Sequence, residues 1–211
     1  MKTIAPSFII EDPLDGDEIL KRIERAGRTC YKSEERITPA SARTFVKKLL
    51  SMGHESVIEH EKITVRIVCD RGITHEIVRH RVASYSQEST RYCNYTKDKF
   101  ENEITFIEPS FWPSASEKER GKYTAWRESM EAAERSYFKL IELGASPQEA
   151  RSVLPNSLKT EIVVTMNLRS WRNFLQQRTA SAAHPQMREI ARPLLDAFKA
   201  QIPVIFDDIT Y

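Results

Sequence analysis

The stretch "KITVRIVCDRGITHEIVRHR", residues 62–81, changes its hydrophobic period halfway along. In its first half apolar side chains recur at every second position, which predicts a half-buried strand; these are Ile63, Val65, Ile67 and Cys69. The second half predicts a helix from Thr74 onward. Strand and helix signals mix along the rest of the chain without regular alternation. We therefore expect an α+β fold with helices and a small, mostly antiparallel sheet.

Other segments carry start and stop signals for regular structure. Asp15 and Glu18 form a capping-box pattern that predicts a helix to about Arg25, with Gly27 near its end. Ser146, Pro147 and Glu149 predict another helix start. The other predicted strands span 2–10, where Pro6 favours an edge strand, and 103–109. The other predicted helices span 39–52, which Gly53 closes, 114–143, 170–178 and 186–202. The segment 161–168 fits either a strand or a helix start.

Length and composition describe an ordinary globular chain. With 211 residues, 40% hydrophobic and 29% charged, residues 1–211 are expected to form a single domain. The 32 basic and 30 acidic residues nearly cancel, which argues against a general nucleic-acid binder. No apolar run approaches the roughly 20 residues of a membrane span, and the N-terminus is too acidic for a signal peptide. With three unpatterned cysteines, these features predict a cytoplasmic protein without a membrane partner.

Hydrogen-bond donors concentrate in "RHRVASYSQESTRY", residues 79–92. Arginine presents a planar fork of N–H donors that matches phosphate or carboxylate oxygens, and hydroxyls add adjustable donors. On a continued helix, Glu76 and His80 would be neighbours, and so would His75 and Arg79. Arginines this close repel one another unless an anion or acids neutralise them, which favours an anion site over a solvated basic turn.

Several chemistries are excluded by spacing. The six glycines do not form a dinucleotide-binding turn or a phosphate loop. His75-Glu76 lacks the second histidine that a zinc protease motif requires at position 79, so no metal site is expected. A second group of Arg and Asn lies in "NLRSWRNFLQQR", residues 167–178, where Arg169 and Asn173 would share a helix face. Taken alone, this helix fits a surface whose Arg and Gln face water better than it fits a binding site, and Arg151 has the same alternative.

Together, these motifs resemble the flavin-dependent thymidylate synthases. The chain has Arg79-His80-Arg81, seven residues and then Ser89, as in the signature of that family. The further matches are "GHESVIEH" at 53–60, "STRY" at 89–92, "EARSVLP" at 149–155 and "NLRSWRNFLQQR" at 167–178. The resemblance implies an enzyme that makes dTMP from dUMP with FAD as cofactor, NADPH as reductant and 5,10-methylenetetrahydrofolate as carbon donor. It also implies a homotetramer whose active sites are shared between subunits.

The resemblance assigns residues position by position. It implies that Arg178 is the catalytic residue, which faces the pyrimidine and stabilises negative charge on the uracil. The implied flavin contacts are Ser56, Arg79, His80, Arg81, Gln87, Asn167, Arg169 and Asn173. The implied dUMP contacts are Glu76, Arg79, Gln87, Glu88, Ser89, Thr90, Arg91, Arg151 and Arg178, with Arg91 and Ser89 at the phosphate.

This sequence departs from the family pattern in three places. Ser86-Gln87 stands where family members often have Asn-Glu, and Glu76 stands where they commonly have Gln. The segment after Arg178 is longer than in relatives and contains His184, to which no role is assigned. Two other functions remain open, namely a flavin enzyme of the same fold that acts on another pyrimidine nucleotide and a non-catalytic nucleotide- or RNA-binding module.

Overall fold

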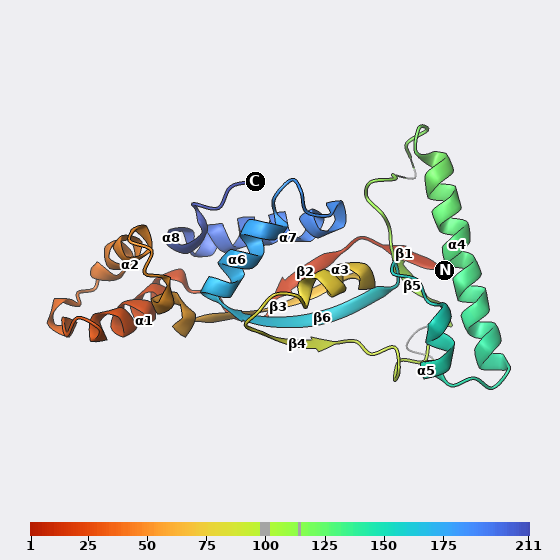
Figure 1. Ribbon diagram of the computed structural model, residues 1–211, viewed down its shortest axis with the longest axis horizontal. Coiled ribbons are helices and arrows are strands. Elements are labelled where there is room, and N and C mark those ends of the chain that lie inside the picture. Colours follow the sequence, from red (N-terminus) through yellow and green to blue (C-terminus); the bar gives the residue numbers. More distant parts are fainter. Residues whose placement is uncertain (98–101, 114) are drawn as a thin grey trace. The chain divides into compact units, whose positions relative to one another are not determined.

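The computed structural model describes residues 1–97, 102–113 and 115–211, and it confirms the α+β fold (Figure 1). The strands are β1 (Lys2–Ile4), β2 (Ser7–Ile10), β3 (Lys62–Asp70), β4 (Ala83–Gln87), β5 (Thr105–Ile107) and β6 (Lys159–Asn167). The α-helices are α1 (Gly16–Thr29), α2 (Ser41–Ser51), α3 (Arg71–Ile77), α4 (Arg120–Glu142), α5 (Pro147–Ala150), α6 (Leu168–Arg178), α7 (Pro185–Gln201) and α8 (Pro203–Phe206). Short 3-10 helices are η1 (Glu34–Arg36), η2 (Glu55–His60) and η4 (Arg151–Val153).

Four strands form a sheet in the order β2-β3-β6-β4. The central strands β3 and β6 run antiparallel, because Leu168 N donates to Glu61 O at one end and Arg71 N donates to Leu158 O at the other. Both show the alternation expected of a half-buried strand, and in β3 the four predicted core side chains are fully buried. The segment 161–168 is thus a strand through Asn167. In a second sheet β1 and β5 pair in parallel.

The chain divides into two compact units. Unit 1 comprises 1–7, 67–78 and 86–162, and unit 2 comprises 8–66, 79–85 and 163–211. Strands β3, β4 and β6 each begin in one unit and end in the other. The prediction of a single domain over 1–211 stays a prediction.

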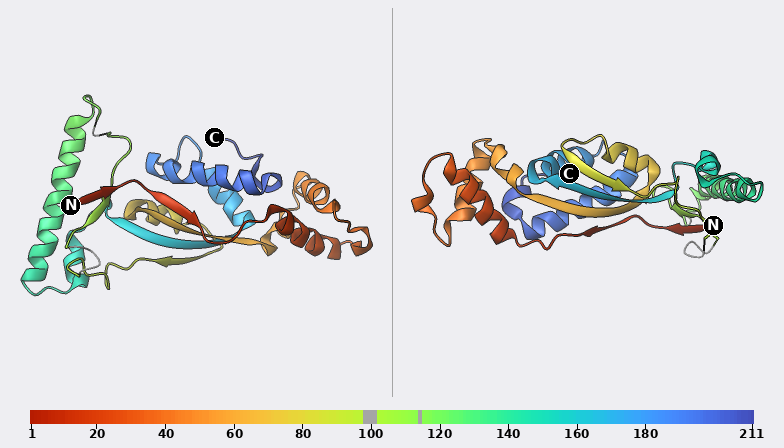
Figure 2. Two further views of the ribbon diagram at one scale, coloured as in Figure 1. Left: turned by 180° about the vertical axis from the view of Figure 1, so that it is seen from behind. Right: turned by 90° about the horizontal axis from the view of Figure 1, so that it is seen from below.

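Unit 1 has its own hydrophobic core under the long helix α4. Trp126, Met130 and Tyr137 on α4 pack with Phe106 of β5 and with Leu158. Figures 1 and 2 show α4 beside the β1–β5 pair. The N-terminal amine is anchored here by carboxylates of Glu103 and Glu134, each at 3.0 Å. Unit 1 is therefore held by apolar burial and by a charge cluster at the start of the chain.

Unit 2 is built around helices α6 and α7. Trp171 of α6 is fully buried between Phe174 and Phe198, each with its ring centroid 5.5 Å away, and its indole N–H donates to Ile63 O at 2.9 Å. Since a buried indole N–H needs an acceptor, this bond fixes α6 against the start of β3. Pro193 lies inside α7, and Pro203 opens α8.

Helices α1 and α2 also pack closely in unit 2. The Asp15 side chain accepts from Glu18 N at 3.0 Å, which confirms the predicted helix start. Gly27 does not end the helix, which continues to Thr29; a Cβ at this position would lie 2.8 Å from a ring carbon of Phe45 on α2. Gly27 therefore allows the close approach of α1 and α2.

Four predicted boundaries are wrong. The strand over 2–10 is interrupted at Ala5-Pro6, because proline cannot donate to a strand ladder. Helix α2 begins at Ser41 rather than at Pro39, and in the turn before it the Ser41 hydroxyl accepts from Thr38 N at 2.9 Å. The long helix begins at Arg120, and the start predicted for it at residue 114 lies outside the described residues. The helix from Thr74 begins earlier, at Arg71, and ends at Ile77.

The predicted helix start at Ser146 is confirmed as a capping box with Glu149.

Within the described ranges, no helix is both long enough and apolar enough to cross a membrane.

Candidate functional site

The Arg79-His80-Arg81 segment follows α3 as an irregular turn. Because α3 ends at Ile77, the helical spacing on which the predicted pairs Glu76/His80 and His75/Arg79 depend is not present. His80 is only 6% exposed, whereas Arg79 and Arg81 are exposed. The His80 carbonyl accepts from the Tyr85 hydroxyl at 2.8 Å and from the Arg81 guanidinium at 3.1 Å. The turn thus buries its histidine and presents its arginines outward.

The buried imidazole of His80 holds Arg178. Arg178 Nε, at the end of α6, donates to His80 Nε2 at 2.9 Å, and the His80 ring packs edge-on against Phe174 at 4.8 Å. Accepting at Nε2 requires the proton to be on Nδ1. Burial, helped by the positive charge of Arg178, lowers the pKa of His80 from 6.5 to about 4. His80 is therefore neutral at physiological pH and can act as a permanent acceptor for the guanidinium.

A pocket of about 470 Å³ opens in unit 2 beside α6 and η2. Four of the predicted flavin residues line it, namely Arg81, Asn167, Arg169 and Asn173, together with Glu55, Glu59, Val82, Ser170, Arg172 and Gln176. Its volume lies in the usual range of small-molecule sites. Ser56 is exposed on η2 and is not among the lining residues. The pocket is thus rich in amide and guanidinium donors but also contains two carboxylates.

Those carboxylates fix Arg169. The Arg169 guanidinium lies 2.6 Å from Glu59 and 3.6 Å from Glu55. Sequence reasoning missed both acids, although they lie four residues apart in "GHESVIEH" and could have been sought as partners for the arginines of α6. Asn167 caps α6, since its side-chain oxygen accepts from Ser170 N at 2.8 Å, and its amide N–H groups are left for a ligand.

Arg172 forms its contacts within the protein rather than with solvent. It is buried, and its guanidinium forms a bidentate pair with Asp208 at 2.6 and 2.7 Å and donates to Ile205 O. Glu55 lies 3.5 Å from its Nε. This arginine therefore ties α6 to the C-terminal segment, and the alternative of a fully water-facing helix is wrong for this face.

The predicted nucleotide residues after β4 gather in unit 1. Residues 89–93 form a tight turn in which Ser89 Oγ accepts from Arg91 N at 3.3 Å. The Arg151 guanidinium lies 3.4 Å from the hydroxyl of the buried Thr90. Arg91 and Arg151 are both exposed. The turn thus places the Arg151 guanidinium beside the Thr90 hydroxyl, and the guanidinium of Arg91 lies over the Tyr92 ring, 5.3 Å from its centroid. Guanidinium and hydroxyl groups are donors that suit a phosphate.

Two other predicted ligand contacts in unit 1 have internal partners. The Gln87 amide donates to the hydroxyls of Thr74 at 3.0 Å and Thr160 at 3.3 Å, and the Glu88 carboxylate accepts from Lys159 at 2.9 Å. Glu76 is half-buried in α3. His184, to which no role was assigned from the sequence, caps α7 by accepting from Gln186 N at 3.3 Å.

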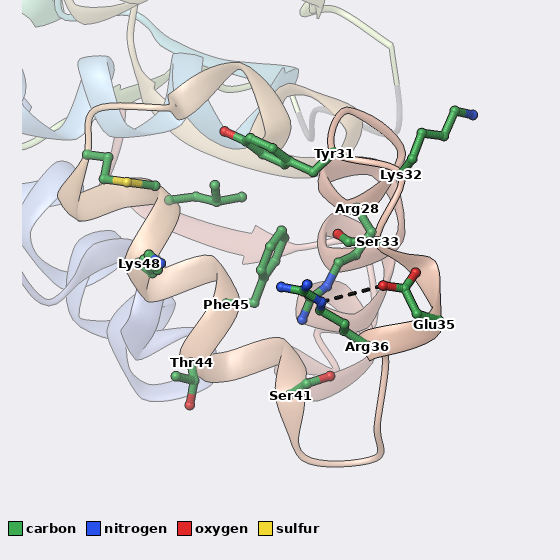
Figure 3. A pocket seen from close by; sticks show the side chains of 12 residues that line it. Arg28, Tyr31, Lys32, Ser33, Glu35, Arg36, Ser41, Thr44, Phe45 and Lys48 are labelled. Atoms are coloured by element: carbon green, nitrogen blue, oxygen red, sulfur yellow. Dashed lines mark ion pairs between the residues drawn. The ribbon is translucent and has the colours of Figure 1, made fainter.

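A second cleft in unit 2, of about 690 Å³, lies between α1, η1 and α2 (Figure 3). No predicted site residue lines it, because its residues come from segments outside the recognised motifs.

Among residues 1–97, 102–113 and 115–211, no cluster of three or more His, Cys, Asp or Glu has the arrangement of a metal site.

Comparison with known proteins identifies the family. The family model described as thymidylate synthase complementing protein matches residues 15–204. The flavin-dependent thymidylate synthase of Geobacter sulfurreducens is 36% identical over 193 residues, which cover 87% of this chain and 78% of that protein. The chain belongs to the flavin-dependent thymidylate synthase family. Enzymes with the same name match from Pyrococcus furiosus, 36% identical over 81% of this chain and 68% of that protein, and from Mycolicibacterium gilvum, 34% identical over 94% and 83%.

Proposed function

We propose that this member of the flavin-dependent thymidylate synthase family converts dUMP to dTMP, with FAD as cofactor, NADPH as reductant and 5,10-methylenetetrahydrofolate as carbon donor. The observation that carries the proposal is the pocket beside α6, in which Arg81, Asn167, Arg169 and Asn173 meet. These are four of the residues that the resemblance assigns to the flavin.

The donor set of this pocket fits a flavin. The Asn167 and Asn173 side chains present amide groups to the edge of a ring, and the exposed Arg81, one nitrogen of which donates to His80 O, would contact a phosphate. Glu59 neutralises Arg169, which suits a polar ring or ribityl chain better than a second phosphate. Ser56, Arg79, His80 and Gln87 complete the proposed set. When bound, FAD supplies the redox chemistry that links NADPH to the methylene donor.

The nucleotide is assigned to the turn after β4. Arg91, Ser89, Thr90 and Arg151 would hold the phosphate, since the Arg151 guanidinium lies beside the Thr90 hydroxyl and the Ser89 hydroxyl contacts the backbone N–H of Arg91. Glu76, Gln87 and Glu88 would contact the ribose or base, and Arg79 would contribute a further donor. For Gln87 and Glu88, the internal hydrogen bonds mean that any contact uses the remaining oxygen atoms.

Arg178 is assigned the catalytic role. Its guanidinium would face the uracil and stabilise the negative charge that develops when the N3 proton is lost. The bond from Nε to neutral His80 supports this role, because it restricts the position of the guanidinium. A charged histidine at the same position would repel the guanidinium.

The test is dUMP-dependent formation of dTMP with the Arg178→Ala and Arg178→Lys variants. Arg178→Ala should retain its flavin and lose most of its turnover, and Arg178→Lys should recover only part, because an ammonium lacks the planar fork. Near wild-type turnover in Arg178→Ala would overturn the assigned role. If NADPH oxidation were stimulated by another pyrimidine nucleotide rather than by dUMP, the substrate would be wrong. A colourless protein with salt-dependent RNA binding would indicate a non-catalytic module.

The assembly belongs to the same proposal. We infer a homotetramer with active sites shared between subunits, in which the whole chain acts as one functional domain, in the cytoplasm. A tetramer should sediment as four chains of 24.4 kDa each. Two inactive variants, Arg91→Ala from unit 1 and Arg178→Ala from unit 2, should regain part of the activity when unfolded and refolded together. No recovery on mixing would contradict shared active sites.

A further inference from the structure

The carbonyl oxygen of His80 is the point at which the turn over residues 79–81 is fastened to the protein. It accepts from the Tyr85 hydroxyl at 2.8 Å and from the Arg81 guanidinium at 3.1 Å. A carbonyl oxygen has two lone pairs, so these two donors use its full capacity. Because the peptide group is planar, holding this carbonyl restricts the backbone from which the imidazole of His80 projects.

Tyr85 is a donor of fixed position. It lies in the middle of β4, an edge strand that pairs with β6 (Figure 1). The alternation of β4 puts Tyr85 on the less exposed face, between the exposed Ser84 and Ser86. Burial raises the pKa of Tyr85, and the positive charge of Arg81 opposes this shift only in part. The hydroxyl therefore keeps its proton at physiological pH and remains able to donate to His80 O.

Arg81 is a donor that a ligand can draw away from His80 O. Its side chain is exposed and lines the pocket of about 470 Å³ beside α6, where it is assigned to the flavin. A hydrogen bond from a guanidinium to a phosphate is stronger than one to a neutral carbonyl. When the guanidinium turns to such a ligand, the bond from Tyr85 is the one of the two that still holds the carbonyl.

The position of this carbonyl matters because the ring of the same residue holds Arg178. His80 Nε2 accepts from Arg178 Nε at 2.9 Å, and the ring packs edge-on against Phe174 at 4.8 Å. A rotation of the backbone at residue 80 would move Nε2 away from the guanidinium. The contacts thus lead from Tyr85 through His80 to Arg178, and all three residues belong to unit 2.

We propose that Tyr85 is a positioning residue of the reaction, whose hydroxyl holds the turn at His80 and through it the guanidinium of Arg178 in the flavin-loaded protein. The inference rests on the proposed function, because that function gives Arg178 its role at the uracil. Tyr85 is not among the residues assigned to the flavin or to dUMP, and it acts through His80 rather than on a ligand.

The experiment compares Tyr85→Phe with the wild type, because this substitution keeps the ring and removes one donor. The matched control is Tyr211→Phe, which removes a hydroxyl that donates to Asp196 at 2.9 Å in the same unit. Tyr85→Phe should lower kcat for dTMP formation about three- to tenfold and change the KM for dUMP less than about twofold. Tyr211→Phe should leave both values nearly unchanged. Equal values of kcat in wild type and Tyr85→Phe, or an equal loss in both variants, would overturn the proposal.

A double-mutant cycle separates positioning from general support of the fold. In the His80→Phe background, Tyr85→Phe should lower kcat by less than about twofold more, because the imidazole that it positions is already absent. If Tyr85→Phe has its full effect in that background, Tyr85 acts by another route and the proposal is wrong.

Exchange of the Arg178 Nε proton with water tests the same contact without turnover. It is followed by NMR in protein with isotope-labelled arginine, and the signal is assigned by its absence from Arg178→Lys. Tyr85→Phe should accelerate this exchange about threefold or more in the FAD-loaded protein, and less in the flavin-free protein, where Arg81 still holds the carbonyl. Equal exchange rates in wild type and Tyr85→Phe would overturn the proposal. If the wild type forms no dTMP but the exchange still depends on Tyr85, the proposed function fails and the positioning of Arg178 stands.

Discussion

The hydrogen bond from Arg178 Nε to His80 Nε2 is the contact on which the proposed catalytic geometry depends most directly. Replacing His80 by Phe keeps a ring of similar size against Phe174 but removes the acceptor. Replacing it by Gln restores an amide oxygen near the position of Nε2. The pair of variants therefore separates the loss of the acceptor from the loss of packing.

The expected magnitude follows from the geometry. A hydrogen bond to a charged group contributes about 1.5–3 kcal/mol, and this one is 2.9 Å long with an imidazole only 6% exposed. If most of that free energy orients the guanidinium in the transition state, kcat of His80→Phe should fall about 10- to 100-fold. His80→Gln should recover at least a few-fold of this loss.

The assay is dTMP formation at saturating co-substrates, with kcat and the KM for dUMP determined separately and the FAD content of each variant measured. An orienting role predicts a fall in kcat when turnover is expressed per bound FAD, whereas a loss of FAD itself would report the flavin contact proposed for His80. The reasoning is refuted if His80→Phe keeps near wild-type kcat, or if His80→Gln is as impaired as His80→Phe while both carry full flavin.

Three further outcomes concern stability, each measured by urea denaturation. Asp208→Ala should lower the free energy of unfolding by about 1–3 kcal/mol, because it leaves the buried guanidinium of Arg172 without its bidentate partner; no loss would mean that the pair is not formed in solution. Gly27→Ala should lower the free energy of unfolding by about 1–3 kcal/mol, since its Cβ would lie 2.8 Å from a ring carbon of Phe45 on α2. The control Gly121→Ala, whose Cβ would lie in open space, should leave the free energy of unfolding nearly unchanged. Equal effects of the two substitutions would contradict the close contact of α1 and α2. The free energy of unfolding should fall by up to about 3 kcal/mol as the pH decreases from about 6.5 to about 4. In this range the unfolded chain binds a proton at His80, whereas the folded chain does not, because its pKa is lowered to about 4. The variant His80→Phe should flatten this pH dependence.

The strands could be predicted where one face is buried. In β3 the alternation of Ile63, Val65, Ile67 and Cys69 gave the element and its core face, because period-2 burial leaves a direct trace in the sequence. The helix starts at Asp15 and Ser146 could also be predicted, since a cap depends on residues within one helical turn. Local chemistry therefore identified most of the elements.

Boundaries and partners set by tertiary contacts could not be predicted. The sequence pattern did not indicate the end of α3 at Ile77, and the His80 ring in the turn that follows packs against Phe174, a contact between segments far apart in the sequence. Arg172 resembles any helix-surface arginine, and only its contacts with Ile205 and Asp208 reveal it as buried. The cleft between α1, η1 and α2 was missed for the same reason, because its residues come from three elements with no shared motif.

The candidate site residues came from the resemblance rather than from periodicity. The structure brings Arg81, Asn167, Arg169 and Asn173 into one pocket, while their contacts with a flavin stay a prediction. Spacing alone had suggested helical pairs around His80, and the helical spacing on which they depend is not present. A motif thus located the segment, but the direction of each side chain required the fold.

The most direct test of the central claim is the absorbance spectrum of the purified protein before and after anaerobic NADPH, with and without dUMP. The account predicts a yellow protein that bleaches with NADPH at a rate that dUMP changes. A colourless protein that takes up no added FAD would contradict it, and the arginine-rich pocket beside α6 would then have to serve another ligand.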